Sequence, residues 1–172
     1  MADPLASRVE RVLAAFRDAN ARLVARLESA SETEAVTAHV AGAWTPAQIG
    51  AHVATFNTLL ASLVSGERPG ASPAPPDFVE RPWTDIQASL LSPVEAPQSL
   101  HPPVSSTRAA SLAALGEAAG AIVQAFTGLS EPRSTFTISH PRVGTISLVQ
   151  AGDWIVAHTI RHNAQMKRVL GR

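Results

Sequence analysis

The distribution of proline limits the fold of this chain more than any other feature. Nine of its thirteen prolines fall between residues 69 and 103, so a long regular helix is excluded there. One short helix is possible at residues 83–91, and the apolar residues around it favour a loop packed along the domain over a disordered linker. Outside this segment, apolar residues recur at intervals of three and four, which predicts amphipathic helices.

Four long helices are predicted. The first runs from about residue 4 into the thirties. The second and fourth each begin with a capping box, in which a Ser or Thr is followed three residues later by Gln. The second helix is expected from Thr45-Pro46-Ala47-Gln48 to Gly66, and the fourth from Ser147-Leu148-Val149-Gln150 to about Leu170. The third is marked by an apolar stripe from Leu112 to Leu129.

These elements predict an all-α fold in a single domain over residues 1–172. The β-prone residues 134–139 and the turn that follows do not make a convincing sheet. A short link makes the first two helices antiparallel, whereas residues 66–103 are long enough to travel back along a helix of about 30 Å. Helices 2 and 3 are then parallel, and we expect a four-helix bundle with up-down-down-up topology and a proline-rich crossover.

Composition excludes several classes of function. The 14 basic residues balance 14 acidic ones, which argues against nucleic acid as a partner because phosphate binding requires clustered Lys and Arg. The absence of cysteine excludes disulfides, a thiolate nucleophile and Cys-ligated metals. Neither a signal peptide nor an uninterrupted apolar span is visible. We therefore expect a soluble cytoplasmic protein that does not bind membranes.

Three of the six histidines fall on helix faces that the apolar periodicity directs into the core. His158 and His162 are four residues apart, so they project from one face of the fourth helix, together with Ile155. His52 lies three residues beyond Ile49, in the apolar stripe of the second helix. Three buried imidazoles without partners are costly, and one shared cation would satisfy them all.

This pattern predicts a divalent metal site at His52, His158 and His162. Three neutral imidazoles with an open coordination position are typical of catalytic rather than structural zinc. Nickel, cobalt and iron(II) also accept imidazole, so the ligand type does not select the ion. We expect zinc or nickel.

Two segments resemble a known family. The first is Trp44-Thr45-Pro46-Ala47-Gln48-Ile49-Gly50-Ala51-His52. The second combines His140-Pro141-Arg142-Val143-Gly144-Thr145, Asp153-Trp154 and His158-Thr159-Ile160-Arg161-His162-Asn163-Ala164-Gln165. Their order and spacing resemble the DinB-like superfamily of damage-inducible metalloproteins, which includes the YfiT-type thiol transferases. The resemblance implies an up-down-down-up bundle, a divalent metal on His52, His158 and His162, and a homodimer. It does not extend to the proline-rich segment.

The remaining polar residues carry weaker signals. Gln165 shares the face of His158 and His162, so it either orients a ligand histidine or a bound water, or is a polar residue near the helix end. No catalytic acid or base is identified. The other candidates are interpreted as loop or surface residues: His39, His101, His140, Glu117 and Asp153. For His101 and His140, a role as proton shuttle is the alternative.

The resemblance implies a metal-dependent transferase that activates a low-molecular-weight thiol and joins it to an electrophilic substrate. The residues themselves indicate only an open metal site, so a metal-activated water acting in hydrolysis is equally compatible with them. An alternative from a different class is a non-catalytic bundle that binds a metal or a small ligand and has a stress-related role. The scarcity of acidic and basic residues near the histidines supports that alternative.

Overall fold

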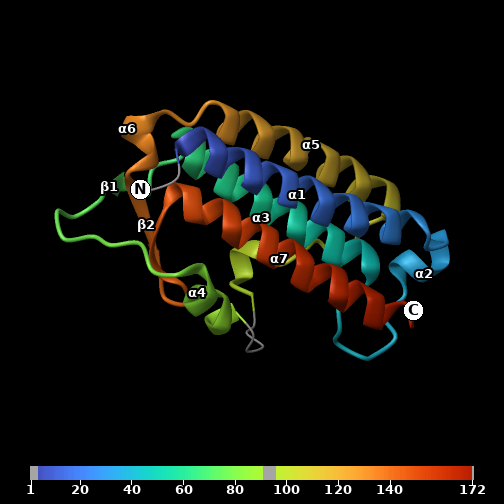
Figure 1. Cartoon of the computed structure of the whole chain (residues 1–172). Helices are drawn as coiled ribbons and strands as arrows, with labels where there is room; N and C mark the ends of the chain where they lie inside the picture. The colour runs from blue at the N-terminus through green and yellow to red at the C-terminus, as the bar shows by residue number, and fades with distance from the viewer. Residues whose placement is uncertain (1–3, 91–95, 172) are drawn as a thin grey trace.

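The computed structural model describes residues 4–90 and 96–171, and it is mainly helical (Figure 1). Four long helices form a bundle: α1 (Leu5–Glu28), α3 (Pro46–Ser65), α5 (Arg108–Thr127) and α7 (Leu148–Val169). Two short helices, α2 (Glu32–Val36) and α6 (Glu131–Ser134), lie in their connections. The predicted four-helix bundle is confirmed.

The long helices follow the predicted up-down-down-up order. In Figure 1 the colour advances from left to right along α1 and α7, and from right to left along α3 and α5. Hydrogen bonds join the parallel pair at both ends. Ser111 Oγ donates to the Ala47 carbonyl at 2.7 Å near the start of both helices. Arg133, just beyond α5, donates to the Leu63 carbonyl at 2.7 Å near the end of α3.

Two glycines allow the helices to approach one another closely. A Cβ on Gly50 of α3 would lie 3.0 Å from Leu27 Cδ2 and 3.2 Å from Ser111 Cβ. A Cβ on Gly152 of α7 would lie 2.9 Å from the Phe126 ring. Such distances are shorter than ordinary van der Waals contacts, so any larger residue at either position would push the helices apart.

The hydrophobic core is divided into two clusters along the bundle. On α3 one cluster ends at Ala54 and the other begins at Phe56. On α7 the division falls between Ile155 and Met166, and this interval contains His158 and His162. Polar side chains therefore occupy the level at which apolar packing is interrupted.

Both capping boxes predicted from the sequence are present. At the start of α3, Thr45 Oγ1 accepts from the Gln48 backbone N–H at 3.2 Å, and Gln48 Oε1 accepts from the Thr45 backbone N–H at 3.0 Å. Ser147 and Gln150 form the same pair of bonds at the start of α7. These caps satisfy N–H groups that would otherwise lack partners and fix the starting residues of the two histidine-bearing helices.

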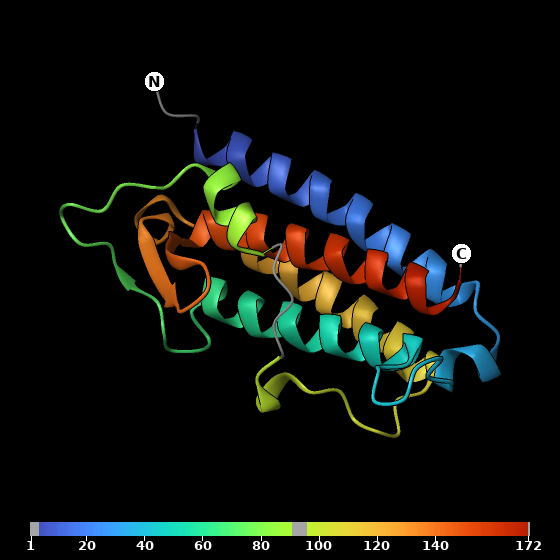
Figure 2. The same ribbon diagram turned by 90° about the horizontal axis from the view of Figure 1, so that it is seen from below.

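The crossover between α3 and α5 packs along the outside of the bundle, as predicted. Its described parts contain β1 (Ser72–Pro73), α4 (Trp83–Leu90) and the 3₁₀ helix η1 (Gln98–Leu100). Figure 1 shows α4 outside the four long helices, and Figure 2 shows β1 and η1 outside them. Ile86 of α4 is fully buried in the hydrophobic core. The part of the predicted short helix at residue 91 lies outside the described residues.

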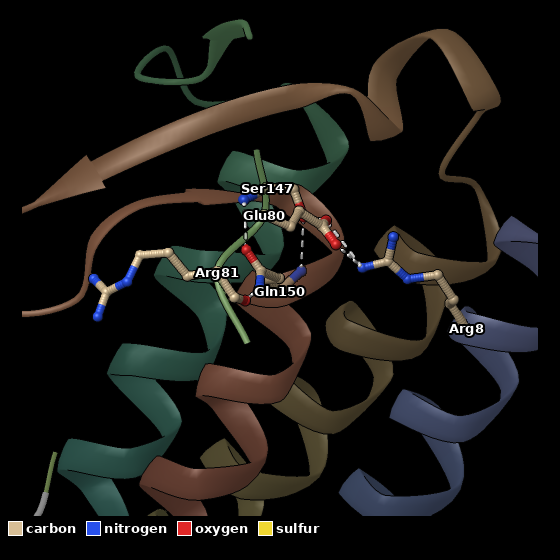
Figure 3. A network of polar contacts seen from close by, with 5 residues as sticks. All are labelled: Arg8, Glu80, Arg81, Ser147 and Gln150. Atoms are coloured by element: carbon tan, nitrogen blue, oxygen red, sulfur yellow. Dashed lines mark hydrogen bonds and ion pairs between the residues drawn. The ribbon is translucent and has the colours of Figure 1, made fainter. Parts of the chain in front are cut away.

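A group of polar residues joins the crossover to the starts of α1 and α7 (Figure 3). Arg8 Nη2 donates to both carboxylate oxygens of Glu80, at 2.8 and 2.9 Å. Ser147 Oγ donates to the same carboxylate. Gln150 Nε2 donates to the Arg81 carbonyl at 2.8 Å. We call these five residues the Glu80 network.

A small antiparallel sheet accompanies the bundle, at the β-prone segment where the sequence does not show a convincing sheet. The β-prone segment forms β2 (Phe136–His140), which pairs with β3 (Gly144–Ser147) and, on its other edge, with β1. Gly144 has a φ of +72°, which lets the chain reverse directly after residues 141–143. Residues 144–147 lie between a predicted turn and a predicted helix, so the sequence does not reveal the partner strand.

The first helix ends earlier than predicted. It stops at Glu28, and α2 begins separately because Ser31 and Glu34 form a third capping box. Ser31 Oγ accepts from the Glu34 backbone N–H at 3.2 Å, and Glu34 Oε2 accepts from the Ser31 N–H at 2.8 Å. A capping box that follows a continuous apolar stripe thus ends one helix and begins another.

Among the described residues one helix, α5, is long and apolar enough to cross a membrane by length and composition alone. Its residues Leu115, Ile122 and Phe126 are buried in the core of the bundle. Burial of this kind is what an apolar helix achieves by packing against other helices.

Candidate metal centre

Three histidines converge between α3 and α7. His52 comes from the second turn of α3, and His158 and His162 come from successive turns in the middle of α7. Each offers one ring nitrogen, and these three atoms all lie within 4.8 Å of one another. This is the arrangement expected from the sequence, and it is the only group of three or more potential metal ligands within residues 4–90 and 96–171.

Hydrogen bonds orient two of the three rings. His52 Nδ1 lies 2.7 Å from the Leu100 carbonyl, and His162 Nδ1 lies 2.7 Å from Gln165 Oε1. Both partners are acceptors, so each Nδ1 carries the proton and each Nε2 keeps its lone pair. Metal-binding histidines are usually held in this way, with the distal N–H donated to an oxygen.

Burial keeps the three rings neutral near pH 7. It is the largest cause of a lowered pKa in each of them, and it brings the pKa of His162 down to about 3. The pKa of His158 falls well below its usual value, with further contributions from the two other imidazoles. The Arg161 guanidinium also lowers each pKa. Among the described residues, no carboxylate is a cause of these shifts, so none of them supplies the negative charge that would stabilise protonated imidazole.

One pair of these nitrogens stands at a separation that suits a divalent cation. His52 Nε2 and His158 Nε2 are 3.2 Å apart. Two nitrogen ligands of a tetrahedral zinc ion lie roughly 3.3–3.4 Å apart, from Zn–N distances of about 2.0–2.1 Å. In the described part of the chain, His158 Nδ1 is buried without a hydrogen-bond partner, whereas a cation bound at Nε2 would offset its desolvation. Three neutral imidazole donors suit a divalent transition-metal ion, and the described residues supply no fourth ligand.

Aromatic side chains enclose the histidines on two sides. The Phe56 ring stacks on His158, with centroids 3.8 Å apart and planes inclined by 19°. Trp44 lies against His52 at 4.7 Å and His162 at 6.5 Å. The sequence predicts both aromatics only as packing residues. Phe56 follows His52 by one helical turn, and that spacing could have placed it beside the site.

The structure separates the other candidates according to their distance from the cluster. Gln165 contacts His162 directly, which is the contact that an orienting role requires. His101 is exposed, its Nε2 bonds to the Ala96 carbonyl at 2.8 Å, and its ring lies edge-on to Trp44 at 5.9 Å. His39 is exposed in the connection before α3.

Asp153 differs from the surface carboxylate that was expected. It is half-buried, and burial raises its pKa to about 6, partly opposed by Arg8 and Arg11. It lines a cavity of about 270 Å³ between α1, α4 and α7, whose lining contains none of the three histidines. Nothing in the local sequence signals this burial, because Asp153 stands alone among residues of ordinary helical type.

Comparison with known proteins assigns the family. Residues 15–166 match the family model of the DinB superfamily. The chain belongs to the DinB superfamily. Among solved structures it is similar to YfiT from Bacillus subtilis, with 20% sequence identity, a TM-score of 0.62, and coverage of 95% of this chain and 87% of that one. YfiT is described as a probable metal-dependent hydrolase with an unusual four-helix bundle topology. No curated protein matches the chain.

The bundle therefore presents a DinB-superfamily fold with three histidines gathered at the level where its core changes from one apolar cluster to the other. Such a set can hold a cation while leaving coordination positions open to small molecules. Within the described part of the chain, no carboxylate joins the imidazoles as a potential ligand or general base.

Proposed function

We propose that this chain is a metal-dependent transferase in which His52, His158 and His162 hold one zinc or nickel ion. The observation that supports it most strongly is the convergence of three neutral imidazoles whose distal N–H groups, for His52 and His162, are already donated to oxygen acceptors. When bound, a divalent ion would lower the pKa of a thiol or water that occupies an open coordination position.

A low-molecular-weight thiol is the nucleophile that we favour. Three neutral donors leave both charges of a divalent ion uncompensated, and Arg161 adds a further positive charge nearby. An anionic thiolate offsets that charge, as the hydroxide formed from a bound water also would. The co-substrate is then an electrophile that accepts the sulfur. The thiol class itself comes from the resemblance to the YfiT-type transferases.

The residues around the cluster have defined tasks in this proposal. The Leu100 carbonyl and Gln165 hold His52 and His162 in the tautomer that presents Nε2. Phe56 and Trp44 limit access of water to the imidazoles. No described side chain stands ready as a proton acceptor, so a proton released from the thiol passes to solvent.

Hydrolysis is the second candidate, because the structurally similar YfiT is described as a probable metal-dependent hydrolase. In this reaction water takes the place of the thiol and the substrate is an ester or an amide. The histidine cluster would serve both reactions through the same open positions.

One experiment separates these activities from a non-catalytic bundle. The purified chain is loaded with zinc or nickel and assayed with monochlorobimane and L-cysteine for transfer, and with 4-nitrophenyl acetate for hydrolysis. We expect turnover in the first assay that a chelator abolishes and that returning the metal restores. His39→Ala serves as a matched control, because it removes an exposed histidine outside the cluster. Tight metal binding without chelator-sensitive turnover in either assay would favour a structural or sensory metal.

A further inference from the structure

A cavity of about 250 Å³ lies next to the histidine cluster and outside it. It is formed by one side of α3, the strand β2, the end of η1 and the first half of α7. Its ten lining residues include Phe56, Leu59, Leu100, Ser139, His140 and Trp154. None of the three clustered histidines is among them.

The cavity and the cluster share two wall residues. Phe56 lines the cavity and stacks on His158 at 3.8 Å. Leu100 lines the cavity, and its carbonyl is 2.7 Å from His52 Nδ1. Trp154, which packs edge-on to Phe56 at 5.2 Å, precedes His158 by one turn of α7. A molecule in the cavity is thus one side chain away from two of the three imidazoles.

The lining selects strongly by chemistry. Seven of its ten residues have apolar side chains and none carries an acidic or permanently charged group. A charged ligand group placed there would lose its hydration without gaining a counterion. Ser139 and His140 are the polar side chains in the lining, and Ser139 Oγ is already hydrogen-bonded to Thr145 Oγ1 at 2.9 Å.

His140 presents a hydrogen-bond donor. The Arg142 backbone N–H donates to His140 Nδ1 at 3.2 Å, so Nδ1 is an acceptor and the proton of the neutral ring lies on Nε2. Burial and the Arg142 guanidinium both lower the pKa of His140, which keeps the ring neutral at pH 7. The ring packs against Trp154 at 4.9 Å, which limits its rotation.

We propose that this cavity binds the apolar part of the electrophilic substrate, a small uncharged molecule with an oxygen that accepts a hydrogen bond from His140 Nε2. The identification of the bound molecule as a substrate rests on the proposed function. Its size suits a single aromatic ring or a short branched chain, since a cavity of about 150 Å³ holds benzene. His140 is a specificity-determining residue here and takes no part in the reaction at the metal.

The test measures binding rather than turnover, so it does not depend on the proposed activity. Three probes of similar size are titrated into chelator-treated and zinc-loaded protein by calorimetry: acetophenone, which has a neutral acceptor oxygen, ethylbenzene, which has none, and benzoate, which is charged. In both forms we expect acetophenone to bind about tenfold more tightly than ethylbenzene, as one buried hydrogen bond implies, and in the chelator-treated protein we expect benzoate to bind most weakly. Benzoate binding as tight as acetophenone in the chelator-treated protein would overturn the proposal.

Two pairs of variants locate the binding. Leu59→Trp fills the cavity from α3 and should abolish acetophenone binding, whereas Thr58→Trp adds the same bulk on the exposed face of α3 and should leave it unchanged. His140→Phe keeps a ring against Trp154 but removes the donor. It should weaken acetophenone about tenfold and leave ethylbenzene unaffected, with His39→Phe as the control. Thermal melts confirm that each variant is folded.

The outcomes distinguish the two proposals. If acetophenone binds as expected while turnover is absent from both assays, the cavity is established and the proposed enzyme activity fails. If chelator-sensitive turnover is observed but Leu59→Trp binds acetophenone as tightly as the unmodified chain, the cavity is excluded as the ligand site and the activity stands.

Discussion

The histidine cluster and the Glu80 network both place polar side chains in partly or fully buried positions where the crossover meets the bundle. They differ in whether those side chains have hydrogen-bond partners and opposite charges. In the Glu80 network each carboxylate oxygen has a donor and Arg8 is paired with an opposite charge. In the histidine cluster, burial and Arg161 oppose protonation, and His158 Nδ1 has no partner within the described residues.

This difference separates a structural contact from a binding site. A network whose donors and acceptors are matched stabilises the fold and gains nothing from a ligand. Buried neutral imidazoles whose nitrogen lone pairs face one another are costly in the folded chain, and a bound cation removes that cost. We therefore expect mutations in the histidine cluster to change metal affinity and mutations in the Glu80 network to change stability.

The largest effect is expected from His158→Ala or His52→Ala. Either change removes one of three metal ligands, so the dissociation constant for zinc should rise by more than the roughly 10–100-fold seen when an outer hydrogen-bond partner is lost. In the metal-free protein, His158→Ala also removes a buried Nδ1 that has no hydrogen-bond partner within the described residues, which offsets part of the packing lost with the ring. Competition with a chromophoric chelator measures the affinity. Equal loss of affinity in His39→Ala would place the site elsewhere.

Glu80→Ala should act on stability alone. It leaves Arg8, whose side chain is 27% exposed, without its ion pair and removes the acceptor of Ser147 Oγ. We expect the free energy of unfolding to fall by about 2 kcal/mol. Urea denaturation of chelator-treated protein measures this, with Glu117→Ala on the exposed face of α5 as the control. Loss of zinc affinity with unchanged stability would contradict the comparison.

Gln165→Ala tests whether orientation of a histidine matters as much as its presence. The change removes the acceptor of His162 Nδ1–H but keeps all three ligands. Zinc affinity should fall by about tenfold, at the lower end of the range for such partners. Gln165→Glu keeps an acceptor and should restore the affinity, whereas Gln165→Leu should not. If all three variants bound zinc as tightly as the unmodified chain, Gln165 would have no role at the site.

The smallest effect is expected from Asp153→Asn, and it depends on pH. Because burial raises the pKa of Asp153 to about 6, the folded chain favours the protonated carboxyl. The unfolded chain releases that proton nearer pH 4, so stability falls as the pH rises from about 4 to 6 and the full cost applies above 6. The Asp153→Asn substitution should therefore raise the free energy of unfolding by about 1 kcal/mol at pH 7.5, after allowing for solvent screening, and by almost nothing at pH 3.5.

Thermal melts at the two pH values measure this difference, which corresponds to a change in melting temperature of about 2–4 °C for a chain of this size. An equal gain at both pH values would show that the amide acts through packing rather than through charge.

Sequence reasoning predicted the long-range order of the fold because local signals marked it. The capping residues Thr45 and Ser147 fixed two helix starts, and the length of the connection at residues 66–103 predicted a crossover between parallel helices. The spacing of His158 and His162 placed both on one face of a helix, where His52 joins them. These features each depend on residues close together in the chain.

Contacts between distant segments could not be predicted in the same way. The pairing of Glu80 with Arg8 joins residues 72 positions apart, and neither has a neighbour that marks it. β3 was missed because a four-residue strand beside a turn has no periodicity of its own to detect. The Leu100 carbonyl reaches His52 from the crossover, 48 positions further along the chain, and no local pattern marks that contact.

The contact between Leu100 and His52 has an evolutionary consequence. The crossover holds the ring through a main-chain carbonyl, a group that every amino acid provides. Selection on this contact therefore acts on the path of the crossover and not on the identity of its residue. As far as this contact is concerned, the residue at position 100 can be exchanged, provided that one peptide group still arrives opposite the histidine. Substitutions there leave no trace in a motif, while a single insertion next to residue 100 would move the carbonyl and release the ring.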